Sequence, residues 1–542
     1  MDEQKEPKKQ TRSFLKGALI LSIAGFFVKG IGFLNWIILS RVLGAEGIGL
    51  YQMAYPVYLL ALSLSSAGLP VAISIITAEK LARGDYRGAG RVFQVSLSVL
   101  TLTGFLLSLA VWTGADSLIE LKLIRDPRAY YSILALAPAI FFVTLLSSFR
   151  GYLQGWQRMT PTAVSQVVEQ LLRVATMLIF ASMLLPKGLE YAAAGATFGA
   201  APGAAAGLMV LIYYYWQVRT EAKAKIAAQP KEIQQEPIWT IVRRLVLLAL
   251  PVSVSDLMLP VVSNLDLLIV PGRLEDAGYS VSQATELFGH LTGMAVPLVN
   301  LTTILTAAMA TSLVPAISAA YAVGDTQGVK SRIATAVRIS HMVTLPAFAV
   351  LLTLAAPIAD MVYHAPQAGR PLEIMAVSVF LLGLHQVTTG VLQGMGHTTV
   401  PLVNMGLSAL AKVILNWLLV GLPALGIAGA ALATVADIGL AAVLNLYFLH
   451  RYSGFHLAIG ELWRPALAAT AMGVVMYGMY GEAARLAGNN FATIASFAVG
   501  VVVYTGVLII AGGLQQDDLE QVPMIGRPML RGLRRMGFFP SK

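Results

Sequence analysis

Stretches of about twenty apolar residues with almost no charge recur along the whole of this chain, for example in residues 92–111 and 491–511. A helix of about 20 apolar residues is what the hydrocarbon of a bilayer requires of a membrane-spanning segment. Only 12% of the residues are charged, against about 25% in soluble domains. The sequence therefore predicts an all-α integral membrane protein with about 14 transmembrane helices and no soluble catalytic domain.

The net charge of +10 is unevenly distributed between the two predicted sides of the membrane. When the loops are placed alternately, one side holds 27 Lys and Arg residues, including the segment from Arg150 to Arg158, and the other side holds 8. Cytoplasmic loops carry the excess of positive charge. We therefore expect both termini in the cytoplasm, and we interpret the charge as a topology signal rather than as a nucleic-acid-binding surface.

Short motifs recur in the same order along the two halves of the chain. Gly151-Tyr-Leu-Gln-Gly returns as Gly390-Val-Leu-Gln-Gly, 239 positions later. The other matches are Gly84-Asp85 with Gly324-Asp325, Arg173 with Lys412, Leu69–Ser74 with Val314–Ser318, and Ala194–Ala196 with Ala428–Ala430, at offsets between 234 and 245. Six helices fit within one offset, so both halves are expected to enter the membrane in the same orientation.

This repeat predicts two six-helix lobes related by an axis along the membrane normal, with the substrate path at the seam between them. Two further apolar runs follow the second lobe and form an extra C-terminal helix pair. The predicted segments are a cytoplasmic tail at 1–13, an N-lobe at 14–219, a cytoplasmic linker at 220–239, a C-lobe at 240–452, the extra helix pair at 453–513 and a basic cytoplasmic tail at 514–542.

Ionisable residues within the apolar segments are costly, and they usually face a cavity or a partner. The candidates for substrate binding are mainly cationic and favour a phosphate or diphosphate; they are Lys29, Arg41, Arg173, Lys412 and His290. The candidates for ion coupling or for structural polar contacts are Glu169, Asp256, Asp266 and Asp437.

Structural roles stay open for several of these residues. Arg173 lies four residues after Glu169, so the two share a helix face and can pair with each other. Lys412 can extend to the membrane interface, and Arg41 can anchor the end of the first helix there. The histidines at 341 and 385 are expected to be satisfied residues of the core.

No motif of enzyme chemistry is found in the sequence. The HExxH zinc motif, the G-x-S-x-G elbow and the Walker A loop are absent, and the chain has no cysteine for a thiolate metal site. We therefore expect neither a catalytic residue nor a bound metal or cofactor. Transport would not be driven directly by ATP, and the membrane potential, H⁺ and Na⁺ are left open as driving forces.

Several segments resemble one known family: Phe14–Leu21, Ser40–Tyr51, Gly68–Ser74, Ala82–Asp85 and Gly151–Pro161. They resemble the stage V sporulation protein B group, in the polysaccharide-flippase branch of the MATE-like (MOP) superfamily. The resemblance extends over both lobes, to about Arg451. It is weaker in the last two helices.

The resemblance implies a flippase for undecaprenyl-diphosphate-linked glycan precursors, above all lipid II, in the bacterial cytoplasmic membrane, working by alternating access with membrane lipids and cell-wall synthesis proteins as partners. Lys29 falls at a position where the family carries a cation. The chain departs from relatives at Asn35 and His290, where Arg is common, and this leaves teichoic-acid or capsule precursors open.

Two other classes are weighed against this one. A MATE-type exporter of cationic drugs would need acidic cavity residues, for which Asp256 and Asp266 are the candidates. A membrane-embedded glycan polymerase or ligase would need carboxylates on a sizeable external loop, and the loops of this chain are short.

Overall fold

The computed structural model describes residues 5–66, 68–227, 236–456 and 459–513, and it contains helices but no strand in these segments. An all-helical fold suits a bilayer because each helix satisfies its own backbone hydrogen bonds. The contacts divide the chain into two compact units. The first unit is residues 1–272 with 280–289, and the second unit is residues 273–279 with 290–542.

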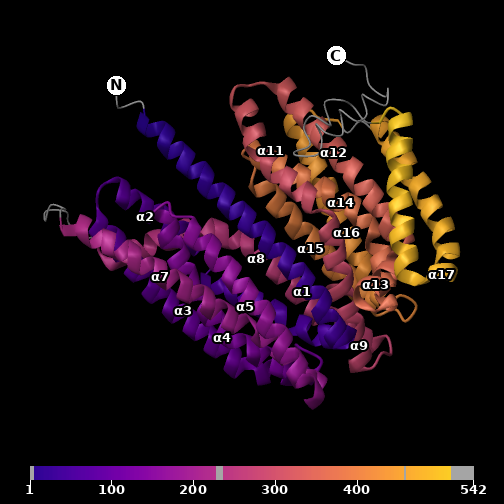
Figure 1. Ribbon diagram of the computed structural model, residues 1–542, viewed down its shortest axis with the longest axis horizontal. Helices are drawn as coiled ribbons and strands as arrows, with labels where there is room; N and C mark the ends of the chain where they lie inside the picture. Colours follow the sequence, from indigo (N-terminus) through magenta and orange to yellow (C-terminus); the bar gives the residue numbers. More distant parts are fainter. Residues whose placement is uncertain (1–4, 67, 228–235, 457–458, 514–542) are drawn as a thin grey trace. The chain divides into compact units, whose positions relative to one another are not determined.

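The first unit holds nine helices in its described part, most of them long enough to cross a bilayer. They are α1 (Lys5–Ser66), α2 (Leu69–Ala82), α3 (Tyr86–Glu120), α4 (Tyr130–Gly155), α5 (Thr160–Leu184), α6 (Leu189–Phe198), α7 (Ala200–Ala227), most of α8 (Ile238–Asp276), and α9 (Val281–Phe288). Within this unit α4 packs against both α3 and α7, and α5 packs against α7 and α1 (Figure 1).

The second unit continues directly from α9 through a seven-residue π-helical stretch, Gly289–Ala295. Its helices are α10 (Val296–Thr302), α11 (Ile304–Ala322), α12 (Thr326–Thr353), α13 (Ala355–Tyr363), α14 (Gly369–Gly394), α15 (Thr399–Val420), α16 (Ile427–Ser453) and α17 (Ile459–Ile510). In this unit α14 packs against α11, α12 and α16 (Figure 1).

Twelve helical segments of the described chain are long and apolar enough to cross a membrane. Two of them are far longer than one crossing needs, at 59 and 49 residues, and each contains a glycine that breaks the helix. Gly44 has φ 66° and ψ −178°, and Gly488 has φ 80° and ψ 170°. A residue with a Cβ is strained at such a positive φ. Dividing both segments at these glycines gives fourteen helices, and that count stays a prediction.

The two units repeat the same close helix contacts. A Cβ on Gly151 of α4 would lie 2.6 Å from the carbonyl oxygen of Pro70 on α2, and a Cβ on Gly390 of α14 would lie 2.6 Å from that of Ala310 on α11. One turn later, Gly155 faces Thr77 and Gly394 faces Ile317. Glycine is required at all four positions because the helix backbones are almost in contact.

These contacts correct the predicted register of one motif. The partners of the repeated glycines, Pro70 with Ala310 and Thr77 with Ile317, are 240 positions apart. The same offset relates Gly84 to Gly324. The similarity of Leu69–Ser74 to Val314–Ser318, at an offset of 245, is therefore not a structural equivalence. The proline occupies different positions on the corresponding helices of the two units, whereas the glycine contacts keep the same register.

A second contact shows the repeat with its residues exchanged. In the first unit Gly104 of α3 faces Thr144 of α4, and in the second unit Thr344 of α12 faces Gly383 of α14. Position 344 corresponds to position 104, and position 383 corresponds to position 144. One small and one larger residue fill the space in both units, although the helix that carries the glycine differs.

The hairpin between α8 and α9 belongs partly to each unit. At the end of α8, Arg273 donates to the carbonyl of Trp417 at 2.9 Å and lies over its indole ring, within the second unit. Within the first unit, Thr285 of α9 donates to Asp126 at 2.8 Å. The chain therefore passes between the units at 272/273, 279/280 and 289/290. The last of these boundaries lies in the π-helical stretch, a feature frequent at functional sites.

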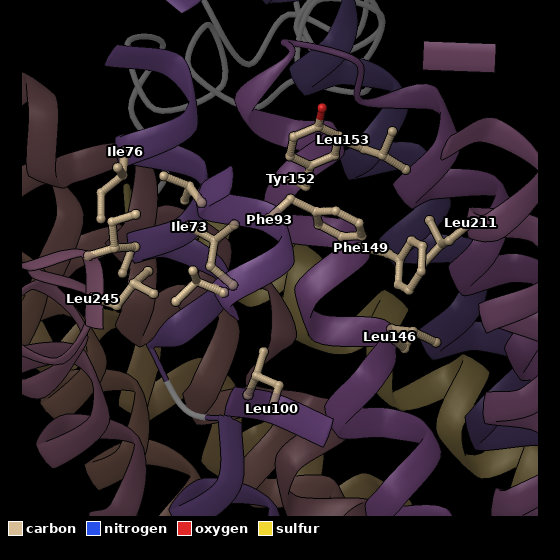
Figure 2. Close-up of a cluster of buried hydrophobic side chains, with 14 of the residues drawn as sticks. Ile73, Ile76, Phe93, Leu100, Leu146, Phe149, Tyr152, Leu153, Leu211 and Leu245 are labelled. Atoms are coloured by element: carbon tan, nitrogen blue, oxygen red, sulfur yellow. The ribbon is translucent and has the colours of Figure 1, made fainter. Parts of the chain in front are cut away.

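Aromatic packing stabilises the interior of the first unit. Phe93 of α3 packs edge-on against Phe149 of α4, with ring centroids 5.1 Å apart, and its ring centroid lies 4.6 Å from that of Tyr152. Figure 2 shows these rings beside Ile73 and Leu211, from α2 and α7. The aliphatic residues around them are fully buried, so this part of the unit is packed as a hydrophobic core.

The predicted segment boundaries concern the sequence repeat, whereas the units are defined by contacts, so the boundaries stay a prediction. Helix α1 begins at Lys5, within the predicted tail. Helix α7 extends to Ala227, into the predicted linker, and α8 begins at Ile238. Residues 228–235 and the predicted tail at 514–542 lie outside the described residues.

Candidate functional site

Two guanidinium groups share one carboxylate in the interior of the first unit. Arg150 of α4 donates through Nη2 to Glu169 Oε2 at 2.8 Å, and Arg173 pairs with Glu169 Oε1 one turn further along α5. Arg150 also donates to the hydroxyl of Ser165 at 3.2 Å. All three charged side chains are largely buried, with between 13% and 24% of their surface exposed. The cluster keeps one net positive charge, which favours an anionic ligand.

Helix α7 approaches this cluster through glycines. A Cβ on Gly203 would lie 2.8 Å from Arg173 Cβ, and one on Gly207 would lie 3.2 Å from Glu169 Cβ. The absence of these side chains lets α7 press against the charged turn of α5. Arg150 and Arg173 supply the contacts that hold Glu169, and Ser165 accepts a hydrogen bond from Arg150.

Three tyrosines of α1 lie beside the part of α5 that carries Arg173. Tyr51, Tyr55 and Tyr58 are spaced by four and three residues and therefore share one helix face. Their ring centroids follow one another at 5.6 and 5.8 Å. Tyr51 and Tyr55 pack in one cluster with Met177, which lies one turn after Arg173 on α5. The cation thus lies beside a row of phenol groups.

Lys29 lies on the part of α1 that follows α5. It is exposed and has no hydrogen bond or ion pair with any described residue. A Cβ on Gly32, three residues later, would lie 3.2 Å from the side chain of Gln170 on α5. The ring of Trp36, two turns after Lys29, packs against that of Tyr51 with centroids 5.3 Å apart. The helical spacing places Lys29 on the same side of α1 as these contacts. Lys29 is thus an accessible cation on the face directed toward α5.

The other candidates of the first unit are dispersed. Arg41 is exposed, three residues before the break at Gly44. Asp256 is exposed on α8, and Asp266 is half-buried on the same helix.

In the second unit, Lys412 of α15 is buried, with 7% of its surface exposed. Its repeat mate is Arg173, and α15 packs against α16. The offset of 234 that relates Gly195 to Gly429 relates Gly203 to Asp437 of α16. Where the first unit brings a glycine against its cation, the second unit therefore has a carboxylate. His290 is buried in the π-helical stretch.

An uncharged network joins α14, α15 and α16 of the second unit, and it was not predicted from the sequence. Asn404 of α15 donates to Asn445 of α16 at 2.8 Å, and Asn445 donates to Thr389 of α14 at 2.9 Å. Asn445 also lies 3.3 Å from His385 Nδ1. Asparagines within apolar helices were the available signal, because a buried amide needs partners on other helices.

The two histidines expected to be satisfied residues of the core differ from each other. His385 has Asn445 as its partner, as expected. His341 is buried and stacks on Phe380 with ring centroids 4.9 Å apart, but neither of its ring nitrogens forms a hydrogen bond with a described residue. The expectation is therefore wrong for His341.

Arg150 was predicted to lie in a cytoplasmic loop, and this is wrong. Helix α4 continues to Gly155, so Arg150 lies within the helix and faces Glu169. The glycines of the Gly-Tyr-Leu-Gln-Gly motif permit close packing of this helix against α2. The predicted cavity between the lobes, like the role of each candidate, stays a prediction.

The repeated helix packing and the twelve candidate spans define a multi-pass membrane protein with the fold of MATE-like transporters. Residues 14–321 match the family model described as polysaccharide biosynthesis protein, and residues 291–418 match MatE. The chain is 31% identical over 527 residues to stage V sporulation protein B of Bacillus subtilis (strain 168), which covers 96% of this chain and 99% of that protein. The chain therefore belongs to the polysaccharide biosynthesis protein family.

Two further comparisons agree with this family. The lipid II flippase MurJ of the same organism is 26% identical over 462 residues, covering 82% of this chain and 84% of that protein. A solved structure of lipid II flippase MurJ, in an inward closed conformation, matches with a TM-score of 0.66 at 14% identity, over 91% of this chain and 98% of that one. The relatives are flippases and transporters, so the chain is a transporter and not an enzyme.

Proposed function

We propose that this protein is a flippase that moves undecaprenyl-diphosphate-linked glycan precursors across the bacterial cytoplasmic membrane by alternating access, with lipid II as its expected substrate. Membership of the polysaccharide biosynthesis family supports this proposal. The observation that carries it is the buried net positive charge of Arg150, Glu169 and Arg173, in the same unit as the accessible Lys29. A diphosphate has several acceptor oxygens for such donors.

Lys29 is the first residue to test. Lys29→Ala should abolish complementation of a strain depleted of its lipid II flippase, because the removed ammonium is accessible and has no structural partner to lose. Arg485→Ala is the matched control, since Arg485 is an exposed cation paired only with Glu482 among the described residues. Full complementation by a well-expressed Lys29→Ala protein would contradict the role of Lys29.

The glycan is tested separately. Reconstituted vesicles containing lipid II, a teichoic-acid precursor or a capsule precursor can each be assayed for lipid movement. Lipid II should move fastest. If a teichoic-acid or capsule precursor moves while lipid II does not, the flippase class holds and the expected substrate is wrong.

A cation exporter is the second candidate, because the MatE match covers residues 291–418 and Asp256 is an exposed acid on α8. Asp256→Asn should then abolish export of a cationic dye and leave precursor movement unchanged. A cation exporter needs acidic residues, whereas the Arg150–Glu169–Arg173 cluster carries a net positive charge. This charge favours the flippase.

The proposed topology has both termini in the cytoplasm. The chain contains no cysteine, so single cysteines are suitable reporters. Lys225→Cys should be protected from a membrane-impermeant maleimide added outside intact cells, whereas Arg370→Cys should react. The reverse pattern would invert the topology.

A further inference from the structure

Hydrogen-bond donors without acceptors gather around Arg173. Its Nε is buried and has no hydrogen-bond partner in the described part of the chain. Tyr51 and Tyr58 are only 8% and 4% exposed, yet their hydroxyls, and that of half-buried Tyr55, form no hydrogen bond with a described residue. A buried guanidinium nitrogen normally has a partner. The three hydroxyl oxygens are not themselves buried and remain open to a hydrogen-bond partner. One buried donor without an acceptor, beside three accessible hydroxyls, therefore needs an explanation.

Glu169 does not supply the missing acceptor. Its two oxygens are engaged by Arg150 and by the terminal nitrogen of Arg173. Arg173 Nε thus stays without an acceptor among the described residues, in the part of α5 that packs beside the tyrosines of α1. Arginine has no acceptor atom, so the group that completes this arrangement must itself carry several acceptor oxygens. Since the cluster keeps one positive charge, an anion fits it better than a neutral ligand.

The second unit does not repeat this arrangement. The offset of 240 that relates α2 to α11 takes the three tyrosine positions to Leu291, Ala295 and Leu298. The phenol groups are therefore not a requirement of the fold, since its other half packs the same helix without them. A structural role shared by both halves is excluded as the reason for these three hydroxyls.

We propose that Arg173, Tyr51, Tyr55 and Tyr58 form a phosphate subsite within the first unit, which takes the diphosphate of a polyprenyl-diphosphate head group. This inference rests on the proposed function and gives its substrate a defined contact surface. Arg173 Nε and the phenol hydroxyls donate to the phosphate oxygens. Arg150 is a positioning residue, because it holds Glu169 while Arg173 faces the ligand.

The test is binding to the full-length protein in lipid nanodiscs, with farnesyl diphosphate as the probe and farnesol as the ligand without phosphate. The wild type should bind farnesyl diphosphate more tightly than farnesol. Each of Tyr51→Phe, Tyr55→Phe and Tyr58→Phe should weaken diphosphate binding by about tenfold, as expected for a hydrogen bond to a charged group. Farnesol binding should not change.

Tyr213→Phe is the matched control, because Tyr213 of α7 is 62% exposed in the same unit. Arg173→Gln should weaken diphosphate binding more than any single phenylalanine substitution. Tyrosine to phenylalanine preserves the ring packing, and thermal unfolding of each variant in the nanodisc will show whether the fold is kept. If the triple variant unfolds, the three single variants carry the test.

Phenylalanine variants that bind farnesyl diphosphate as tightly as the wild type would overturn the subsite. The tyrosine hydroxyls would then contact water and no ligand. That result would not affect the flippase proposal. A wild type that does not distinguish farnesyl diphosphate from farnesol would contradict both. Binding that depends on the tyrosines, in a protein that moves no lipid-linked glycan, would uphold the subsite and contradict the flippase.

Discussion

The buried polar groups of the two units occupy corresponding positions but differ in charge. In the first unit Arg150 donates to both Ser165 and Glu169, and the offset of 239 relates Arg150 and Ser165 to Thr389 and Asn404 of the second unit. There the neutral amide of Asn445 joins Thr389 and Asn404. Corresponding positions are thus joined directly by an arginine in the first unit, and through the amide of a third helix in the second unit.

This difference separates polar groups that hold the helices together from charged groups that are available to a ligand. Neutral amide and hydroxyl groups hold membrane helices together without an excess charge. Two arginines on one carboxylate leave a positive charge that costs free energy unless an anion or water compensates it. The positions related by the offset of 239 are therefore charged around Arg150 in the first unit and neutral around Asn445 in the second.

The largest effect should follow from removing the shared carboxylate. Glu169→Gln leaves Arg150 and Arg173 buried without their counter-ion, so it should lower the free energy of unfolding by about 3 kcal/mol, as for a broken buried pair. The comparable change in the second unit removes no charge. Glu221→Gln is the control, because its pairs with Arg158 and Lys225 are more exposed and should contribute under about 1 kcal/mol. Denaturant unfolding in detergent measures both, and a Glu169→Gln protein as stable as the wild type would contradict the comparison.

The repeated glycine contacts should respond equally in both units. Gly151→Ala and Gly390→Ala each place a methyl group 2.6 Å from a backbone oxygen, and both should cost about 1–3 kcal/mol through overpacking. Gly90→Ala on α3, where a Cβ meets nothing within 4 Å, should be neutral or stabilising. Unequal losses for Gly151 and Gly390 would break the structural equivalence derived from these contacts.

The amide hub of the second unit should have a moderate effect. Asn445→Ala leaves Asn404 and Thr389 without their partner and should cost about 1–2 kcal/mol. The corresponding residue of the first unit, at the offset of 234, is buried Leu211, whose surroundings contain no such network. Asn490→Ala, at an exposed position of α17, is the control. Thermal stability in detergent unaffected by Asn445→Ala would show that the network does not hold the helices.

The smallest effects concern the helix caps that both units share. Asp85 and Asp325 each accept a hydrogen bond at 2.8 Å from the backbone N–H three residues later. Asp325→Ala should cost about 1 kcal/mol. Asp85→Ala should cost more, because Asp85 also lies 3.4 Å from Lys80 Nζ in a largely buried pair. Equal losses in unfolding experiments would show that this ion pair adds nothing to the cap.

The repeat, the membrane class and several candidate residues were accessible from the sequence. Apolar length predicted the helices because the bilayer sets that length independently of tertiary contacts. The spacing of Glu169 and Arg173 predicted a shared helix face, and the structure pairs them. The pairing of Arg173 with Lys412 as repeat mates followed from one offset, since a duplicated helix keeps its residue spacing.

Tertiary structure decided which polar groups meet, because that depends on contacts between helices far apart in sequence. Arg150 contacts Glu169 because α4 continues past the point where a loop was predicted. The proximity of the α1 tyrosines to Arg173 of α5 is also a contact between helices far apart in sequence. The register of the repeat was likewise decided by backbone approach at Gly151 and Gly390, because packing constrains the residues in contact while a proline elsewhere on the helix is free to move.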